Sequence, residues 1–111
     1  DTSTITSCGN DFSFEDLFAR TLEALGAPGD CLLAITTSGN SDNVYRALEV
    51  AKEKGLHTFG FLGSGGGKCL SLCDYSFVVP SENTANIQEA HIVAGHALMT
   101  YVEQSLAIDY F

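Results

Sequence analysis

The residues best suited to chemistry are four hydroxyl side chains gathered within one short segment, residues 36–41. They are Thr36, Thr37, Ser38 and Ser41, with Gly39 among them. Hydroxyl groups can donate hydrogen bonds to phosphate oxygens, and a glycine lets the backbone approach a ligand closely. Where a strand gives way to a helix, free N–H groups also favour an anion. The segment therefore predicts a phosphate-binding loop; the alternative is that Ser41 caps the helix and the other hydroxyls end the strand.

A second group of candidates lies near the end of the chain, where Gln88 and His96 fall on one stripe of an expected helix. The imidazole of His96 can act as an acid or a base at neutral pH. Eight residues of straight helix separate the two by about 12 Å. One copy of the helix therefore cannot ligate one ion through both, unless Gln88 sits in a distorted first turn or different subunits contribute. For His91 and His96 the alternative is a polar helix face in contact with solvent or another subunit.

Two other features have weaker signals. Asn10 and Asp11 could bind sugar hydroxyls, but on the sequence alone a helix-capping role is favoured. The glycine-rich segment 63–68 does not match a nucleotide-binding P-loop, because its glycines and flanking residues do not fit that motif. We expect it to be a flexible turn whose Lys68 lends charge to a nearby site.

The elements that must position these residues alternate between helices and strands. Helices are expected over residues 12–25, 44–54 and about 85–106, a short helical piece over 68–73, and strands over 31–36, 57–62 and 75–79. Residues 31–36 have the unbroken apolar pattern of a strand buried on both faces. Phe12, Phe14 and Phe18 are expected in the core. This order predicts an α/β fold with a parallel sheet and right-handed crossovers.

Composition narrows the class of protein. The 111 residues fit one domain, and a net charge of −9 with scattered bases argues against nucleic acid as a partner. No apolar run reaches the roughly 20 residues of a membrane span, so a soluble, cytoplasmic protein is expected.

The four cysteines are expected as thiols. The chain does not begin with Met, and three strands would leave an apolar edge uncovered, so we expect a missing N-terminal portion.

Several short stretches carry a family resemblance in one order and spacing. They are Ser7–Phe12, Pro28–Asp30, Thr36–Ser41, Ala51–Gly55, Gly65–Lys68 and Asn86–His91, with His96 beyond. Together they resemble the sugar isomerase (SIS) family, and most closely its sedoheptulose-7-phosphate isomerase branch. The resemblance implies a five-stranded, flavodoxin-like parallel sheet with flanking helices, in a homotetramer with shared active sites. Residues 1–111 would then form a single SIS domain lacking its N-terminal helices and first strand.

The resemblance also implies roles for individual residues. The four hydroxyls of residues 36–41 would hold the substrate phosphate, and Asn10 and Asp11 would contact the sugar chain. Gln88 and His96 match positions that line the catalytic centre. In some members these positions bind one zinc ion per active site, together with a histidine and a glutamate from the missing portion. Ala85 departs from a carboxylate found near the site in some relatives.

The reaction implied by the resemblance is an aldose–ketose isomerisation. Sedoheptulose 7-phosphate would become D-glycero-D-manno-heptose 7-phosphate through an enediolate, on the route to lipopolysaccharide heptose. This chemistry needs an acid, a base and a fixed phosphate, and His96 is the expected acid/base residue. The other acid/base partner in the family pattern, a glutamate, is not among these residues, so the isolated stretch is expected to be inactive. Two alternatives stay open: a non-catalytic SIS adaptor that binds a replication initiator protein, and another sugar-phosphate isomerase or sensor.

Overall fold

A parallel three-stranded sheet forms the centre of the structure, a computed structural model that describes residues 14–106. The strands β1 (Cys31–Ile35), β2 (His57–Gly63) and β3 (Tyr75–Val79) pair in the order β1-β2-β3. The register places Ile35 beside Phe61 and Phe61 beside Phe77. All three carboxyl ends therefore lie at the same edge of the sheet. The predicted α/β architecture with a parallel sheet is confirmed.

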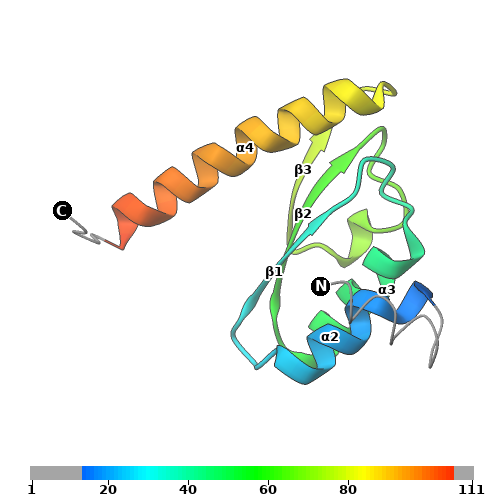
Figure 1. Cartoon of the computed structure of the whole chain (residues 1–111), viewed down its shortest axis with the longest axis vertical. Helices are drawn as coiled ribbons and strands as arrows, with labels where there is room; N and C mark the ends of the chain where they lie inside the picture. The colour runs from blue at the N-terminus through cyan, green and yellow to red at the C-terminus, as the bar shows by residue number, and fades with distance from the viewer. Residues whose placement is uncertain (1–13, 107–111) are drawn as a thin grey trace.

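Helices lie on both faces of this sheet (Figure 1). They are the short helix η1 (Phe14–Asp16), α2 (Leu17–Leu25), α3 (Asp42–Lys54), the short helix η2 (Leu70–Leu72) and α4 (Thr84–Ser105). Helix α2 packs against α3, and both lie on the opposite side of the sheet from α4. Helix α4 runs past the sheet, so its second half extends away from the other elements. Gly55 ends α3 in the left-handed conformation, as its type and position predict.

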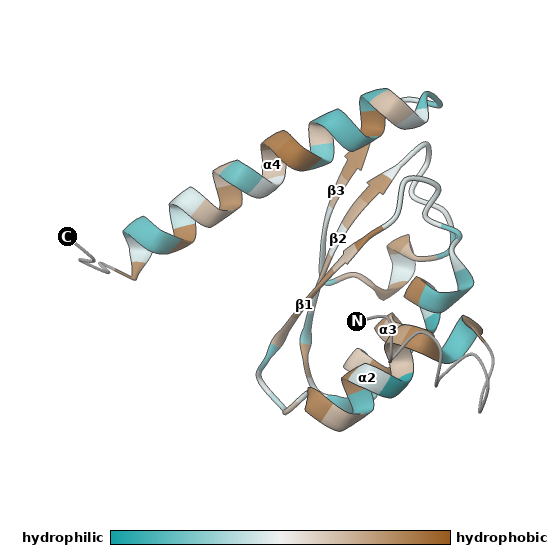
Figure 2. Cartoon of the chain, viewed as in Figure 1, coloured by the Kyte–Doolittle hydropathy of each residue, from teal (hydrophilic) through white to brown (hydrophobic). Residues whose placement is uncertain are grey.

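The core lies between the sheet and α3. Ala34 of β1, Leu62 of β2 and Leu48 of α3 meet there with Cys69, and Leu48, Leu62 and Cys69 are fully buried. Alternation along each strand sends these side chains to one face and their neighbours to the other. Apolar residues accordingly dominate the strands (Figure 2).

The other face of the sheet carries aromatic residues toward α4. Phe59 stacks on Tyr75 with 5.2 Å between ring centroids, and Phe61 meets Phe77 edge to face at 5.9 Å. Helix α4 covers this face only in part, because Tyr75 and Phe77 remain exposed. The aromatic face forms one wall of the space beside α4.

Two burial expectations are wrong. Strand β1 is one of the two edge strands of the described sheet, and its Ile35 is 54% exposed rather than buried on both faces. Phe14 of η1 and Phe18 of α2 are also exposed, and the residue that α2 buries is Ala19. Phe12 lies outside the described residues. In both cases no described element covers the outer side.

Two composition-based expectations can also be compared with the fold. No helix within residues 14–106 combines the length and apolar character needed to span a membrane. Cys31, Cys69 and Cys73 are free thiols, as expected, whereas Cys8 lies outside the described residues.

Replacing Leu62 by Ala tests the position of the core. Because Leu62 is fully buried, Leu62→Ala should lower the free energy of unfolding of the full-length protein by about 2–5 kcal/mol. The matched control Leu25→Ala shortens a side chain that is 77% exposed, and it should change the free energy of unfolding by no more than about 0.5 kcal/mol. Denaturant titration measures both values, and equal losses would contradict this assignment of the core.

Candidate active site

Residues 36–41, here called the hydroxyl loop, connect the carboxyl end of β1 to the start of α3. The backbone N–H of Thr36 still donates to the Phe61 carbonyl of β2, at 3.0 Å. The Ser41 carbonyl then accepts from the backbone N–H of Tyr45, a hydrogen bond in the first turn of α3. Ligands of open parallel sheets bind beyond the carboxyl ends of the strands, and the hydroxyl loop occupies that place.

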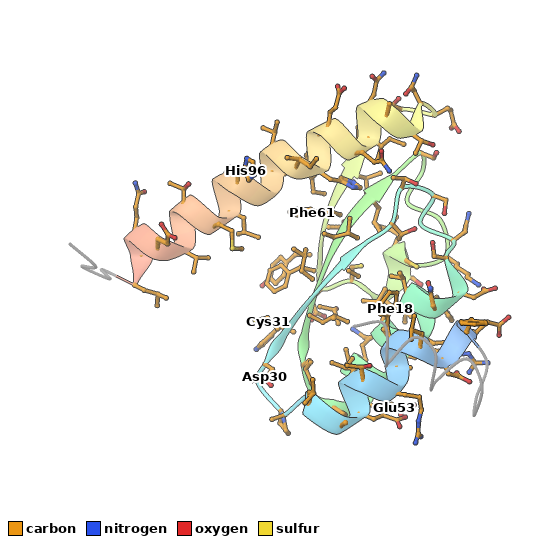
Figure 3. All side chains as sticks on the ribbon, in the orientation of Figure 1. Phe18, Asp30, Cys31, Glu53, Phe61 and His96 are labelled. Atoms are coloured by element: carbon orange, nitrogen blue, oxygen red, sulfur yellow. The ribbon has the colours of Figure 1, made fainter. Side chains whose placement is uncertain are left out.

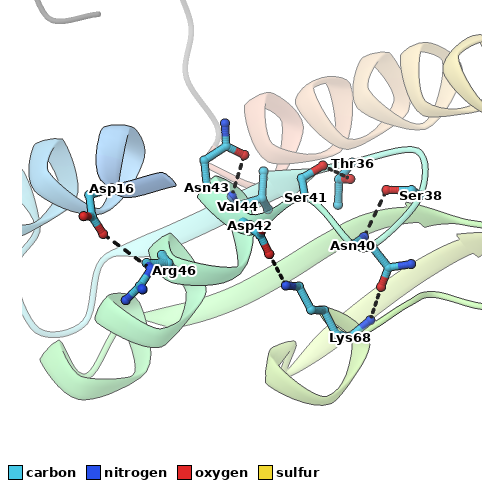
Figure 4. A network of polar contacts seen from close by, with 10 residues as sticks. All are labelled: Asp16, Thr36, Ser38, Asn40, Ser41, Asp42, Asn43, Val44, Arg46 and Lys68. Carbon is cyan, nitrogen blue, oxygen red and sulfur yellow. Dashed lines mark hydrogen bonds and ion pairs between the residues drawn. The ribbon is translucent and has the colours of Figure 1, made fainter. Parts of the chain in front are cut away.

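The side chains of this loop are joined to one another (Figure 4). The hydroxyls of Thr36 and Ser41 lie 2.8 Å apart, and the Gly39 N–H donates to Thr36 Oγ1. The backbone N–H of Asn40 donates to Ser38 Oγ at 3.0 Å. The loop is therefore held in one arrangement by its own hydrogen bonds.

The alternative reading of Ser41 as a capping side chain is wrong. Ser41 occupies the N-cap position of α3, but its hydroxyl makes no hydrogen bond to the helix backbone. It is paired with Thr36 Oγ1 instead. Its hydroxyl therefore contributes to the shape of the loop rather than to the helix end.

A cleft of about 560 Å³ opens beside the hydroxyl loop, between the sheet and α4. The polar residues Thr36, Thr37, Gln88 and His96 line it, with Leu33, Ile35, Phe61 and Ile92 among its apolar walls. Figure 3 shows Phe61 between the sheet and α4, and His96 further along the helix. The volume is within the range of about 300–1,000 Å³ typical of small-molecule sites. Hydroxyls and an exposed imidazole thus share one cleft.

The structure brings together only part of the expected site. Thr36 and Thr37 line the cleft with Gln88 and His96, whereas Ser38 and Ser41 are elsewhere in the hydroxyl loop. Asn10 and Asp11 lie outside the described residues. Within residues 14–106 no group of three or more His, Cys, Asp or Glu side chains could hold a metal. The cleft therefore has the polar groups of a binding site, without a metal centre made by the described residues.

His91 is the residue whose surroundings the sequence misjudges most. The alternative of a polar, exposed helix face is wrong for His91, because this residue is only 5% exposed and lies beside the Phe61 ring. Its Nε2 donates to the Leu62 carbonyl at 2.8 Å, since a carbonyl can only accept. Buried Ile87 stands exactly one four-residue step earlier on α4, and that spacing is the signal that could have revealed its burial.

Lys68 approaches the site, but its charge is already paired. Its ammonium group forms an ion pair with Asp42 in the first turn of α3 and lies 4.9 Å from the centre of the Tyr45 ring. The Lys68 hydrogen bond holds the pKa of the Asp42 carboxyl below its ordinary value of 3.8. The same pair raises the pKa of Lys68. Lys68 therefore joins the glycine-rich segment to α3, a role the sequence did not predict.

Comparison with known proteins gives relatives across most of this chain. No family model matches. The phosphoheptose isomerase of Paramagnetospirillum magneticum is 56% identical over 103 residues, which are 93% of this chain and 54% of that protein. That of Aneurinibacillus thermoaerophilus is 50% identical over 106 residues, 96% of this chain and 54% of its own length. This chain is homologous to the phosphoheptose isomerases. It spans about half the length of these relatives.

Solved structures of phosphoheptose isomerases have the same fold as this chain. The structure from Neisseria gonorrhoeae matches with a TM-score of 0.86 and 43% identity, covering 87% of this chain and 55% of that one. The structure from Francisella tularensis matches with a TM-score of 0.90 and 39% identity, covering 94% and 58%. These matches agree with the resemblance drawn from the sequence. The adaptor and sensor alternatives find no support among these phosphoheptose isomerase homologues.

Titration of Asp42 tests the ion pair beside the site. Because Lys68 stabilises the charged carboxylate, the midpoint should lie below 3.8 and should rise toward that value in Lys68→Gln. The stability this pair contributes is present above the unfolded-state pKa and is lost as pH falls through the lower folded-state pKa. Carboxyl-carbon NMR of the full-length protein measures the midpoint. An Asp42 midpoint that Lys68→Gln leaves unchanged would contradict the pairing.

Proposed function

We propose that this chain forms part of a phosphoheptose isomerase, which converts sedoheptulose 7-phosphate to D-glycero-D-manno-heptose 7-phosphate by aldose–ketose isomerisation. The observation that carries the proposal is identity of about 50% to phosphoheptose isomerases over nearly all of this chain. The cleft beside the hydroxyl loop supports it, because hydroxyls and an imidazole are found together there.

The hydroxyl loop is proposed to hold the phosphate. Thr37 lines the cleft, and its hydroxyl makes no hydrogen bond to another described residue, so its proton is available to a ligand. Ser38 accepts from the Asn40 N–H, which leaves its own proton free to donate. In the Thr36–Ser41 pair one hydroxyl donates to the other, so the second keeps a proton for the ligand. A fixed phosphate would hold the reacting carbons of a flexible sugar in place.

His96 is proposed to transfer a proton at the other end of the substrate. The isomerisation removes a proton from C1 of the ketose and protonates the carbonyl oxygen, which gives an enediol. It then removes the proton of the C1 hydroxyl and returns one to C2, which gives the aldose. His96 is exposed at the cleft, where its imidazole can take part in these transfers. Gln88 lines the same cleft and is proposed to hydrogen-bond the substrate through its amide.

The described residues do not by themselves fit a zinc site. Gln88 and His96 would be the ligands from this chain, but they are two donors about 12 Å apart along α4. A zinc site takes four ligands in structural sites and three protein ligands in catalytic ones. Any zinc bound at this cleft would need ligands from other residues, and the proton transfers proposed for His96 involve only its own side chain.

A homotetramer is proposed from the resemblance and is supported by the surface of α4. The helix exposes several large apolar residues along its length: Ile92, Val93, Met99, Tyr101 and Val102. Exposed apolar surface of this kind typically marks a contact with another protein surface. Association of copies through α4 would cover it.

Removal of the Thr37 hydroxyl tests the phosphate loop. Thr37→Val keeps the shape of the side chain and deletes one donor, so KM for sedoheptulose 7-phosphate should rise about fivefold, corresponding to about 1 kcal/mol for one hydrogen bond. The control Thr100→Val changes an exposed position far along α4 and should leave KM unchanged. Steady-state kinetics of the full-length protein decide the matter, and an unaltered KM for Thr37→Val would argue that this hydroxyl does not bind substrate.

Substitution of His96 tests the proton transfer and, with it, the proposed reaction. In the full-length protein His96→Ala should lower kcat by about 10²–10⁴-fold with little change in KM. His57→Ala is the matched control, because His57 is exposed at the opposite end of β2. Conversion of sedoheptulose 7-phosphate is followed by product analysis. Wild-type protein without turnover would refute the activity, and full activity of His96→Ala would refute the role of His96.

A further inference from the structure

The hydroxyl loop lies directly against the glycine loop, residues 64–68, which follows β2. Gly39 and Gly67 both have positive φ, at +72° and +59°. A Cβ atom added at Gly39 would lie 2.0 Å from the Gly66 carbonyl oxygen, and one added at Gly67 would lie 2.5 Å from the Gly39 carbonyl. Real Cβ atoms do not approach backbone so closely, so the two loops touch in a way that only glycine permits.

Two hydrogen bonds fasten this contact. The backbone N–H of Cys69 donates to the Gly39 carbonyl at 2.9 Å. The backbone N–H of Lys68 donates to Asn40 Oδ1, also at 2.9 Å. The N–H groups of two successive residues, Lys68 and Cys69, therefore both donate hydrogen bonds to the hydroxyl loop.

Asn40 connects the contact to the hydroxyls. Its side chain accepts from the glycine loop, while its own backbone N–H donates to Ser38 Oγ. The neighbouring Gly39 N–H donates to Thr36 Oγ1 in the same way. Figure 4 shows the line from Ser38 through Asn40 to Lys68. A displacement of Asn40 would therefore move the hydroxyls on its N-terminal side.

We propose that Asn40 is a positioning residue for phosphate binding. Its hydrogen bond to the Lys68 N–H, together with the Gly39–Gly67 backbone contact, is here called the clamp. The clamp fixes the hydroxyl loop before the ligand binds. The inference rests on the proposed phosphate site and concerns a residue that need not touch the substrate. A loop ordered in advance loses less conformational freedom when it binds. The clamp should therefore affect binding of the phosphate more than the chemical step.

Two variants weaken the clamp from opposite sides, and a third serves as the control. Asn40→Ala removes the acceptor for the Lys68 N–H, and Gly67→Ala places a methyl group against the Gly39 backbone. Gly65→Ala lies in the same loop, but its added Cβ has nothing within 4 Å. In the full-length protein, kinetics with sedoheptulose 7-phosphate and inhibition by inorganic phosphate are measured beside the thermal melting temperature.

The first two variants should raise both KM and the inhibition constant of inorganic phosphate about five- to tenfold, with kcat within twofold of wild type. Gly65→Ala should leave KM, the inhibition constant of inorganic phosphate and kcat unchanged. Asn40→Ala and Gly67→Ala alter opposite sides of the same contact. If only one of the two variants folds, its kinetic constants still test the proposal. A merely structural role would lower the melting temperature and leave KM and phosphate inhibition in place.

Different results separate this inference from the proposed function. If wild type turns over the substrate while Asn40→Ala and Gly67→Ala keep their KM, the clamp is refuted and the isomerase assignment stands. An equal rise in KM for Gly65→Ala would also refute the specific contact. If wild type neither turns over sedoheptulose 7-phosphate nor responds to inorganic phosphate, the proposed function fails and the inference falls with it.

Discussion

Close backbone contact between two loops at one edge of the sheet holds the candidate active site in shape. Glycines at positions 39 and 67 allow the contact, and N–H groups of the second loop hydrogen-bond the first. Gly63 also permits close backbone contact with the hydroxyl loop, because a Cβ atom there would lie 2.3 Å from the Thr37 carbonyl oxygen. The parallel sheet brings these segments together, since all its strands end at one edge. The geometry of the hydroxyls thus depends on residues that need not bind any ligand.

Local patterns were sufficient to predict the framework. Tyr75–Val79 is a strand with the bounds its apolar residues and following proline indicate. Helix α3 ends before Gly55, where a left-handed residue is needed. The crowding of hydroxyls at residues 36–41 also indicated the loop beside the cleft. In each case the determining signal lies within a few neighbouring residues.

Features that depend on distant segments were not predictable in the same way. The sequence predicts a close backbone approach at Gly39 but does not show the contact of Gly39 with Gly66 and Gly67 that the structure contains. Lys68 was expected to lend its charge to the site, but Asp42 pairs with it. His91 is buried because α4 crosses Phe61 at that point. These outcomes follow from tertiary contacts that a single sequence does not display.

The central claim is that the hydroxyl loop binds the phosphate of a sugar, and its most direct test is a crystal structure of the full-length protein with sedoheptulose 7-phosphate bound. The account predicts phosphate oxygens at hydrogen-bond distance, about 3 Å, from hydroxyls or backbone N–H groups of residues 36–41. The reacting end of the sugar should then lie toward His96. A phosphate bound at any other part of the protein would contradict the account.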